Sequence, residues 1–250
     1  MFVVCSVIRA ISINKAYSVY IMQHEFQNWT GVDTDTFDHW LSLVPPNALV
    51  LDVGCVQGRS AFPFIHHGIR LIGFDISDEL IRIAQKCSTS YMHPKTSPYF
   101  FVGDASDFSF SDASFDAVVL HGVLHHLSNP GHVCCEIARV LKPGGIFFGF
   151  ENNKTPIRWI FDQLQQLMPQ WHEEAGEEPL ISKDMLTRWF DGTGMSITTR
   201  TRVFVPPHVV NLFSPGAAHH LLKTTDMICM HIPIIRSWGG LIEIIGIKKA

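Results

Sequence analysis

The chain has 250 residues, of which 46% are hydrophobic and 17% are charged. These proportions exclude an intrinsically disordered chain, which combines low hydrophobicity with high charge. The formal net charge is −4 and no basic stripe is evident, so we expect no nucleic-acid partner held through its phosphates. No apolar stretch approaches the ~20 residues that a spanning helix needs, which predicts no stable membrane insertion.

The cysteines and the amino-terminal stretch bear on location and domain organisation. The six cysteines are scattered without a C-x-x-C motif, which indicates a reducing compartment and predicts a cytoplasmic protein. Residues 1–24 are apolar in patches but are interrupted by Arg9 and Lys15. We interpret them as an extension, either frayed or preceding the native start, with a signal peptide or anchor as the alternative. A single domain is expected over 25–250.

Short β-rich runs alternate with helical patterns along the chain. The expected strands cover 48–53, 70–75, 99–102, 115–120, 145–150, 195–205 and 240–248. The expected helices cover 60–67, 78–87, 130–141, 156–168 and 183–190, and 206–236 is irregular to helical. Near-continuous apolar strands separated by helices predict an α/β fold with a doubly wound, mostly parallel seven-stranded sheet. The last two strands would pair as a hairpin, and 151–238 would contain a helical cap or insertion that recognises the substrate.

The expected ligand site lies at the carboxyl ends of the strands, where doubly wound sheets bind their ligands. The first strand is followed by a turn with Gly54 and Gly58, and glycines allow backbone to approach a ligand closely. The second strand ends in Asp75, whose carboxylate can accept both hydroxyls of a ribose. The third is followed by Asp104. Two acidic strand ends beside a glycine turn indicate a site for an adenosine-like group.

Five sequence blocks carry a more specific resemblance. They are VLDVGCVQG (50–58), GFD (73–75), VGDA (102–105), SFDAVVLHGVLHHL (114–127) and ARVLKPGGIFF (138–148). In this order and spacing they resemble the class I S-adenosylmethionine-dependent methyltransferases of the type 11 group. The resemblance implies a Rossmann-like fold, S-adenosyl-L-methionine as cofactor, a small-molecule acceptor and a cofactor-binding core at 48–150.

The resemblance also implies roles for residues at the methionine end of the cofactor. Asp52, Gly54 and Gly58 would line this part of the pocket. His121 would lie close to the methionine portion or the sulfonium, and an anionic pocket suits a sulfonium cation.

Four further residues would bind the nucleoside part. Asp75 would accept the ribose hydroxyls, and Ile76 would pack on the adenine. Asp104 and Ala105 would flank the adenine, with Asp104 accepting from its amino group.

One position departs from the family pattern. The family commonly has glycine where this chain has Val56, and a β-branched residue disfavours positive φ and adds bulk. A non-catalytic or weakly binding module with the same fold is therefore an alternative function. A nicotinamide-dependent oxidoreductase is a third hypothesis, but it expects G-x-G-x-x-G, and the spacing of Gly54 and Gly58 differs from that motif.

His125 and His126 are the candidate catalytic residues. Methyl transfer from a sulfonium is an in-line displacement, in which the protein mainly aligns the acceptor and excludes water. A hydroxyl acceptor must also lose its proton, and a neutral imidazole can take it near pH 7. Packing and capping at a helix start is the alternative role of both residues. His121 and His125 are four residues apart, as in some metal sites, but no third ligand has a convincing spacing, so we expect no metal.

Overall fold

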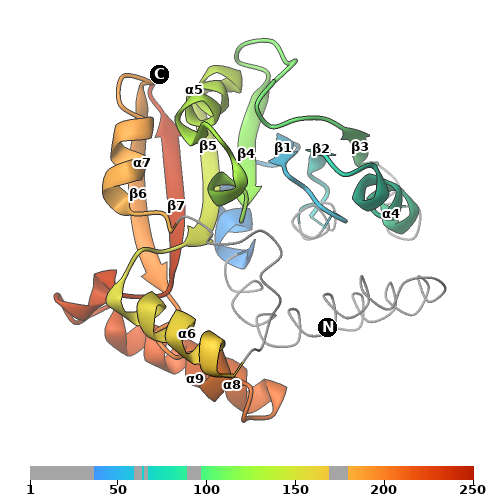
Figure 1. Cartoon of the computed structure of the whole chain (residues 1–250). Coiled ribbons are helices and arrows are strands. Elements are labelled where there is room, and N and C mark those ends of the chain that lie inside the picture. The colour runs from blue at the N-terminus through green and yellow to red at the C-terminus, as the bar shows by residue number, and fades with distance from the viewer. Residues whose placement is uncertain (1–36, 59–63, 65–66, 89–96, 169–179) are drawn as a thin grey trace.

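The protein folds around a seven-stranded sheet with the order β3-β2-β1-β4-β5-β7-β6 (Figure 1). The computed structural model describes residues 37–58, 64, 67–88, 97–168 and 180–250. All neighbouring strands are parallel except β7, which runs antiparallel to β5 and β6. The strands are β1 (Leu49–Val53), β2 (Arg70–Asp75), β3 (Tyr99–Val102), β4 (Phe115–His121), β5 (Leu141–Asn152), β6 (Met195–Arg202) and β7 (Leu241–Lys248). The predicted doubly wound sheet and its terminal hairpin are confirmed.

Four of the helices named here, α4 to α7, begin at a residue whose side chain caps the first turn. The longer helices are α4 (Asp78–Ser88), α5 (Pro130–Val140), α6 (Pro156–Leu167), α7 (Lys183–Trp189) and α9 (Pro215–Cys229), with the single turn α8 at Pro207–Val210. Residues 37–43 are also helical. Asn129, Thr155 and Ser182 accept backbone amides of the first turns of α5, α6 and α7. The Ser77 hydroxyl accepts the Leu80 amide at 3.3 Å, as expected for a cap of α4. The expected helix over 60–67 and the extension 1–24 lie largely or wholly outside the described residues. In the part of the chain that the structure describes, no helix is long and apolar enough to cross a membrane.

Two hydrophobic clusters cover the two faces of the sheet. Phe147 and Phe148 are neighbours in β5 and point to opposite faces, because successive side chains of a strand alternate. Phe148 belongs to the cluster that includes the 37–43 helix, α4, α6 and α9. Phe147 belongs to the cluster formed with α5 and α7. Helices on both faces explain why the strands are apolar along almost their whole length.

Two strand boundaries differ from the sequence prediction by three residues or more. β5 begins at Leu141 rather than at residue 145, and Leu141 still pairs with Phe115. The Lys142–Gly145 segment then forms an irregularity, after which Ile146 pairs with Ala117. β6 ends at Arg202, because the next residue, Val203, adopts φ +65° and leaves the ladder.

Candidate cofactor and active site

The turn after β1 depends on glycine. Gly54 has φ +68° and Gly58 has φ +88°, a conformation that favours glycine. The amides of Gly54 and Cys55 both donate to the Phe74 carbonyl, at 2.9 and 3.0 Å, so the turn is tied to the end of β2. A Cβ atom on Gly54 would lie 2.4 Å from Cγ2 of Val123, in the loop after β4. The loops after β1 and β4 therefore pack together only because residue 54 has no side chain.

Asp75 links three of the predicted blocks. Its Oδ2 accepts the Val56 amide at 3.0 Å, and its Oδ1 accepts the Ser77 amide at 2.9 Å. Its backbone carbonyl accepts the Gly103 amide at 3.0 Å, which ties β2 to the loop after β3. A carboxylate offers about four acceptor sites, so each oxygen keeps capacity for one further donor. This acceptor chemistry fits the two hydroxyls of a ribose, which would donate.

Val56 adopts a left-handed backbone conformation. Its φ is +50°, which is unusual for any residue with a Cβ and strained for a β-branched one. The hydrogen bond that the Val56 amide donates to Asp75 holds the loop in this conformation. Val56 is therefore a strained residue within the turn after β1.

The remaining acidic residues lie in contrasting surroundings. Asp52 is fully buried in β1, whereas Asp104 is exposed after β3 and accepts the Ser106 amide at 2.8 Å. That hydrogen bond lowers the pKa of Asp104 below its ordinary value. Burial, followed by the nearby charges of Asp52 and Asp75, raises the pKa of the Cys55 thiol. The carboxylates of Asp52 and Asp75 thus lie close to the glycine turn. The negative electrostatic field of two carboxylates suits a cationic ligand.

The apolar candidates around the nucleoside position are placed as follows. Ile76 is 73% exposed directly after β2, so its side chain is accessible for packing on a ligand. Ala105 is half-buried and packs against the cluster that contains Phe74. Their contacts with adenine stay predictions.

His121 forms part of an aromatic wall at the end of β4. Its ring centroid lies 5.1 Å from Phe150, 5.8 Å from Phe37 and 6.4 Å from Trp40. The side chain is buried. The helix at 37–43 therefore closes this side of the strand end, and the expected role of His121 near the methionine portion stays a prediction.

His125 is paired with a buried carboxylate that the sequence reading did not single out. Its Nδ1 lies 2.6 Å from Oε2 of Glu151, near the end of β5, and both side chains are almost fully buried. The other oxygen of Glu151 accepts the amides of Val123 and Leu124, at 2.9 and 2.7 Å. Because a carboxylate only accepts, Nδ1 carries the hydrogen, and Nε2 is the nitrogen that can take a proton.

His126 differs from its neighbour. It is exposed, and its ring centroid lies 3.9 Å from that of His125. Within the described part of the chain, no group of three histidine, cysteine or acidic side chains is arranged to hold a metal ion.

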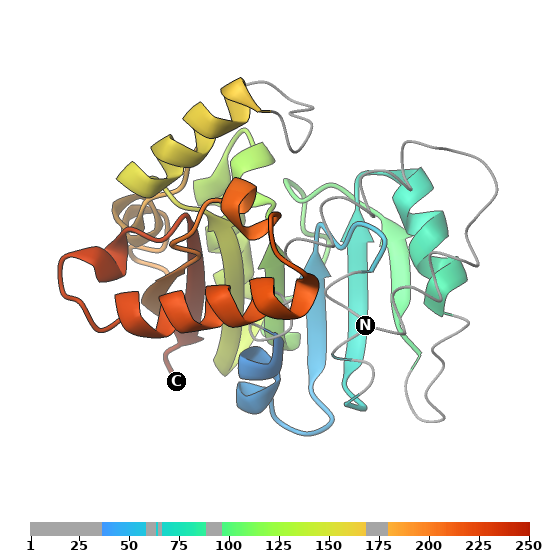
Figure 2. The same ribbon diagram turned by 90° about the horizontal axis from the view of Figure 1, so that it is seen from below.

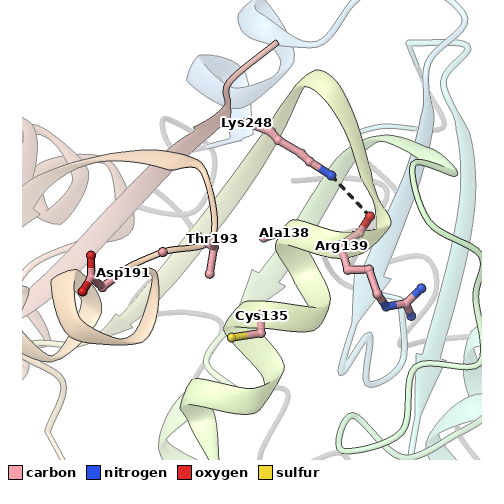
Figure 3. Close-up of a pocket in the computed structure, with 7 residues that line it drawn as sticks. Cys135, Ala138, Arg139, Asp191, Thr193 and Lys248 are labelled. Atoms are coloured by element: carbon pink, nitrogen blue, oxygen red, sulfur yellow. Dashed lines mark hydrogen bonds between the residues drawn. The ribbon is translucent and has the colours of Figure 1, made fainter.

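A shallow hollow of about 400 Å³ lies elsewhere on the molecule (Figure 3). Its lining comes from the last turns of α5, the turn before β6 and the end of β7, where Lys248 donates to the Arg139 and Leu141 carbonyls. Lys248 pairs with Met195, the first residue of β6, so the hollow lies at the amino ends of the parallel strands. It is thus on the opposite edge from the glycine turn and is not the candidate site.

The strand order, the glycine turn and the acidic strand ends define a Rossmann-like class of proteins that bind a nucleoside cofactor at the carboxyl edge of the sheet. Residues 51–149 match the type 11 "Methyltransferase domain" family. The chain belongs to the class I S-adenosylmethionine-dependent methyltransferases, whose methyl donor is S-adenosyl-L-methionine. This membership favours the methyltransferase over the oxidoreductase hypothesis.

The relatives include enzymes named for quinone compounds. The chain is 32% identical to a demethylmenaquinone methyltransferase of Renibacterium salmoninarum, over 60% of this chain and 68% of the relative. It is 31% identical to a 2-methyl-6-phytyl-1,4-hydroquinone methyltransferase of Synechocystis sp., over 61% of this chain and 46% of that protein. The second match thus spans less than half of the relative.

A solved structure of similar fold contains a putative methyltransferase in complex with the Haloferax volcanii Trm112 methyltransferase activator. The TM-score is 0.62 at 21% identity, and the alignment covers 94% of this chain and 95% of that one. At this sequence identity the comparison shows that the two proteins share a fold, and nothing more.

Glu151 is the functional candidate that the sequence reading missed. A signal for it exists: it is the one acidic residue in the apolar run 145–151, near the carboxyl end of a central strand. A charge in such a place needs partners, since burying an unpaired carboxylate is costly. The partners of Glu151 are the amides of Val123 and Leu124 and the ring of His125, in the loop after β4.

Proposed function

We propose that the protein transfers a methyl group from S-adenosyl-L-methionine to the hydroxyl of a small phenolic or hydroquinone-type acceptor. The observation that carries the proposal is the meeting of the β1 turn, Asp75 and the His125–Glu151 pair at one edge of the sheet. The names of the quinone methyltransferases among the relatives support a quinone-type ring in the acceptor. The choice of its hydroxyl rests on the His125–Glu151 pair. We also propose that the protein is located in the cytoplasm.

The cofactor would be held by the residues that the sequence predicted. Asp75 would accept the ribose hydroxyls, with Ile76, Asp104 and Ala105 around the adenine. The open turn at Gly54 and Gly58, with Asp52 beneath it and His121 beside it, would hold the methionine portion. When bound, the cofactor supplies an activated methyl group on a sulfonium centre that leaves as a neutral thioether.

His125 would act as the general base. Its Nε2 would take the proton of the acceptor hydroxyl as the oxygen forms its bond to the methyl carbon. Glu151 would fix the ring and its tautomer and would stabilise the imidazolium that forms. His126, which is exposed, would instead touch the acceptor or solvent.

The second candidate function is a non-catalytic module with the methyltransferase fold. The φ of +50° at Val56 favours it, because a branched side chain stands where the family has glycine. This module would bind the cofactor weakly or not at all.

Calorimetric titration with S-adenosylhomocysteine separates the two functions. We expect the wild type to bind it and Asp75→Asn to bind at least tenfold more weakly. Asp107 is an exposed carboxylate two residues beyond Ala105. The variant Asp107→Asn is the matched control and should bind S-adenosylhomocysteine like the wild type. Absence of binding by the wild type would establish the non-catalytic alternative.

Turnover is then measured as transfer of labelled methyl groups to a panel of soluble dihydroxybenzenes. His125→Gln should lower kcat by ~10²–10⁴ with cofactor affinity retained, the usual contribution of a general base. His126→Gln is the matched control and should lower kcat far less. Equal effects of the two substitutions would contradict the assignment of the base.

A further inference from the structure

The apolar strand β7 carries a buried charge. Glu243 lies in the run LIEIIGI (241–247), whose other members are apolar or glycine, and its side chain is fully buried. A buried carboxylate needs partners, because leaving it unpaired is costly. An apolar side chain would fill the same position without that need, and replacing a buried ion pair by apolar residues often leaves stability unchanged or raises it. The charge of Glu243 therefore indicates a role other than stability.

Glu243 contacts two side chains of the 37–43 helix and one of the edge strand β6. Its Oε1 accepts Nε1 of Trp40 at 3.0 Å and lies 3.0 Å from Nδ1 of His39. Its Oε2 accepts Nε of Arg200, whose Nη2 also lies 3.0 Å from Nδ1 of His39. This Nδ1 donates to the carboxylate when it carries a hydrogen and accepts from the guanidinium when it does not. The helix is thus tied to the ion pair in both states.

A row of paired residues leads from Glu243 to the candidate site. Glu243 pairs with Phe150 of β5, and Phe150 pairs with His121, the last residue of β4. On its other side Glu243 pairs with Arg200. Residues directly opposite each other on neighbouring strands have their side chains on the same face of the sheet. Because such strands lie about 4.8 Å apart, the Cα atoms of Glu243 and His121 are separated by about 10 Å.

The 37–43 helix, drawn in blue, covers this row on the face of the sheet that α9 also covers (Figure 2). The ring centroid of Trp40 lies 5.3 Å from that of Phe37, with the rings edge to face. The Phe37 centroid lies 5.8 Å from His121 and 6.4 Å from Phe64, which follows the glycine turn. The helix therefore joins the end of β4 to the segment after the glycine turn.

We propose that Glu243 is a positioning residue, which holds the 37–43 helix and its part of the aromatic wall against the end of β4. The carboxylate fixes Trp40, and Phe37 carries this constraint to His121. That the wall then tightens binding of the methionine portion of the cofactor rests on the proposed function. The nucleoside contacts should not depend on Glu243, because β2, which carries Asp75, is separated from β7 by β1, β4 and β5.

Hydrogen exchange of the full chain tests the hold on the helix. Glu243→Gln removes the charge at nearly constant size, and Trp40→Phe removes the Nε1 donor but keeps an aromatic ring. In both variants we expect the amides of 41–44 to exchange about tenfold faster or more, the order expected when a hydrogen bond to a charged group is lost. Glu136→Gln is the matched control, because Glu136 pairs with Arg139 on α5, which packs on the opposite face of the sheet. Its amides at 41–44 should exchange like those of the wild type.

Two ligands separate positioning from a general loss of structure. S-Adenosylhomocysteine includes the amino-acid portion, whereas 5′-methylthioadenosine has the nucleoside thioether without it. In calorimetry, Glu243→Gln should bind S-adenosylhomocysteine about tenfold more weakly, because a loosened wall must be ordered on binding. It should bind 5′-methylthioadenosine like the wild type, and Glu136→Gln should bind both ligands like the wild type. A merely structural role of Glu243 would weaken both ligands equally.

A variant without the buried charges guards against a loss of folding. Glu243→Met with Arg200→Met fills the same space with apolar side chains, so its melting temperature should stay near that of the wild type. It should still show the faster exchange at 41–44 and the weaker binding of S-adenosylhomocysteine.

Three results would overturn the proposal. They are unchanged exchange at 41–44 in Glu243→Gln and in the double variant, an equal loss of affinity for the two ligands, and an unfolded double variant, which would show that the ion pair serves stability. A wild type that binds neither ligand would instead overturn the proposed function. Hydrogen exchange would then still decide whether Glu243 holds the helix.

Discussion

Val56 gives the sharpest test of how the turn after β1 is built. A residue with a Cβ in the left-handed region costs about 1–2 kcal/mol, and Val56 has φ +50°. Glycine removes this strain but makes the unfolded chain more flexible, which costs about 0.5–1 kcal/mol. Val56→Gly should therefore stabilise the protein by about 0.5–1 kcal/mol. For a chain of this size each kcal/mol raises Tm by about 2–4 °C.

Two control variants separate backbone strain from side-chain bulk. Val56→Ala keeps the Cβ and most of the strain, so its Tm should stay near that of the wild type. Ala113→Gly relieves the same conformation, φ +51°, in the exposed loop before β4 and should also raise Tm. Only Val56→Gly should tighten binding of S-adenosylhomocysteine in calorimetry, because residue 56, unlike residue 113, donates its amide to Asp75. A lower Tm for Val56→Gly, or equal affinity gains in the two glycine variants, would refute the reasoning.

Three further substitutions test other contacts. Glu151→Gln should lower kcat about 10–100-fold, because His125 loses the carboxylate that orients it. The KM for the cofactor should change little, whereas the pH profile of kcat should shift. An unchanged pH profile would mean that Glu151 has only a structural role. Asp226→Ala should lower the free energy of unfolding in urea by about 3–5 kcal/mol, since it removes the buried carboxylate that accepts both Nε of Arg202 and the Val203 amide; a loss below 1 kcal/mol would show that this ion pair is dispensable. Burial opposes ionisation of Asp116, but hydrogen bonds from the Leu49 amide and Lys142 outweigh it and hold the pKa of Asp116 below its ordinary value. The stabilisation by Asp116, about 1 kcal/mol, should be present above its unfolded-state pKa near 4 and be lost as pH falls through the lower folded pKa. Urea unfolding of Asp116→Asn and wild type should therefore converge in acid, and a constant difference from pH 7 to pH 2 would contradict this assignment.

The sheet could be predicted because its strands are apolar on both faces. The bounds of β2 and β3 coincide with the prediction, since each is a short apolar run between polar residues. The start of β5 at Leu141 could not be predicted from such a pattern of apolar and polar residues. Lys142 and the proline and glycines after it are typical of a break, yet Leu141 pairs with Phe115 before the irregularity. Pairing across a break depends on the neighbouring strand, which local sequence does not describe.

The candidate site was predictable to the extent that it follows from strand ends. Asp75 lies where an acidic strand end was expected, and Gly54 has the positive φ that the turn needs. The partner of His125 was not predictable, because Glu151 is 26 residues away and reaches it only through the pairing of β4 with β5. A pair of residues on two different strands can be predicted only when the register between those strands is known.

Asp75 and Glu151 each fix the loop that follows a neighbouring strand. Asp75, at the end of β2, holds the turn of the neighbouring strand β1 through the Val56 amide. Glu151, near the end of β5, holds the loop of its neighbour β4 through two amides. The two loops meet where Gly54 contacts Val123, between the strands at which the order of the sheet reverses. Doubly wound folds bind ligands at this reversal. Each loop is therefore fixed by the strand outside it, so the site is shaped before any ligand arrives.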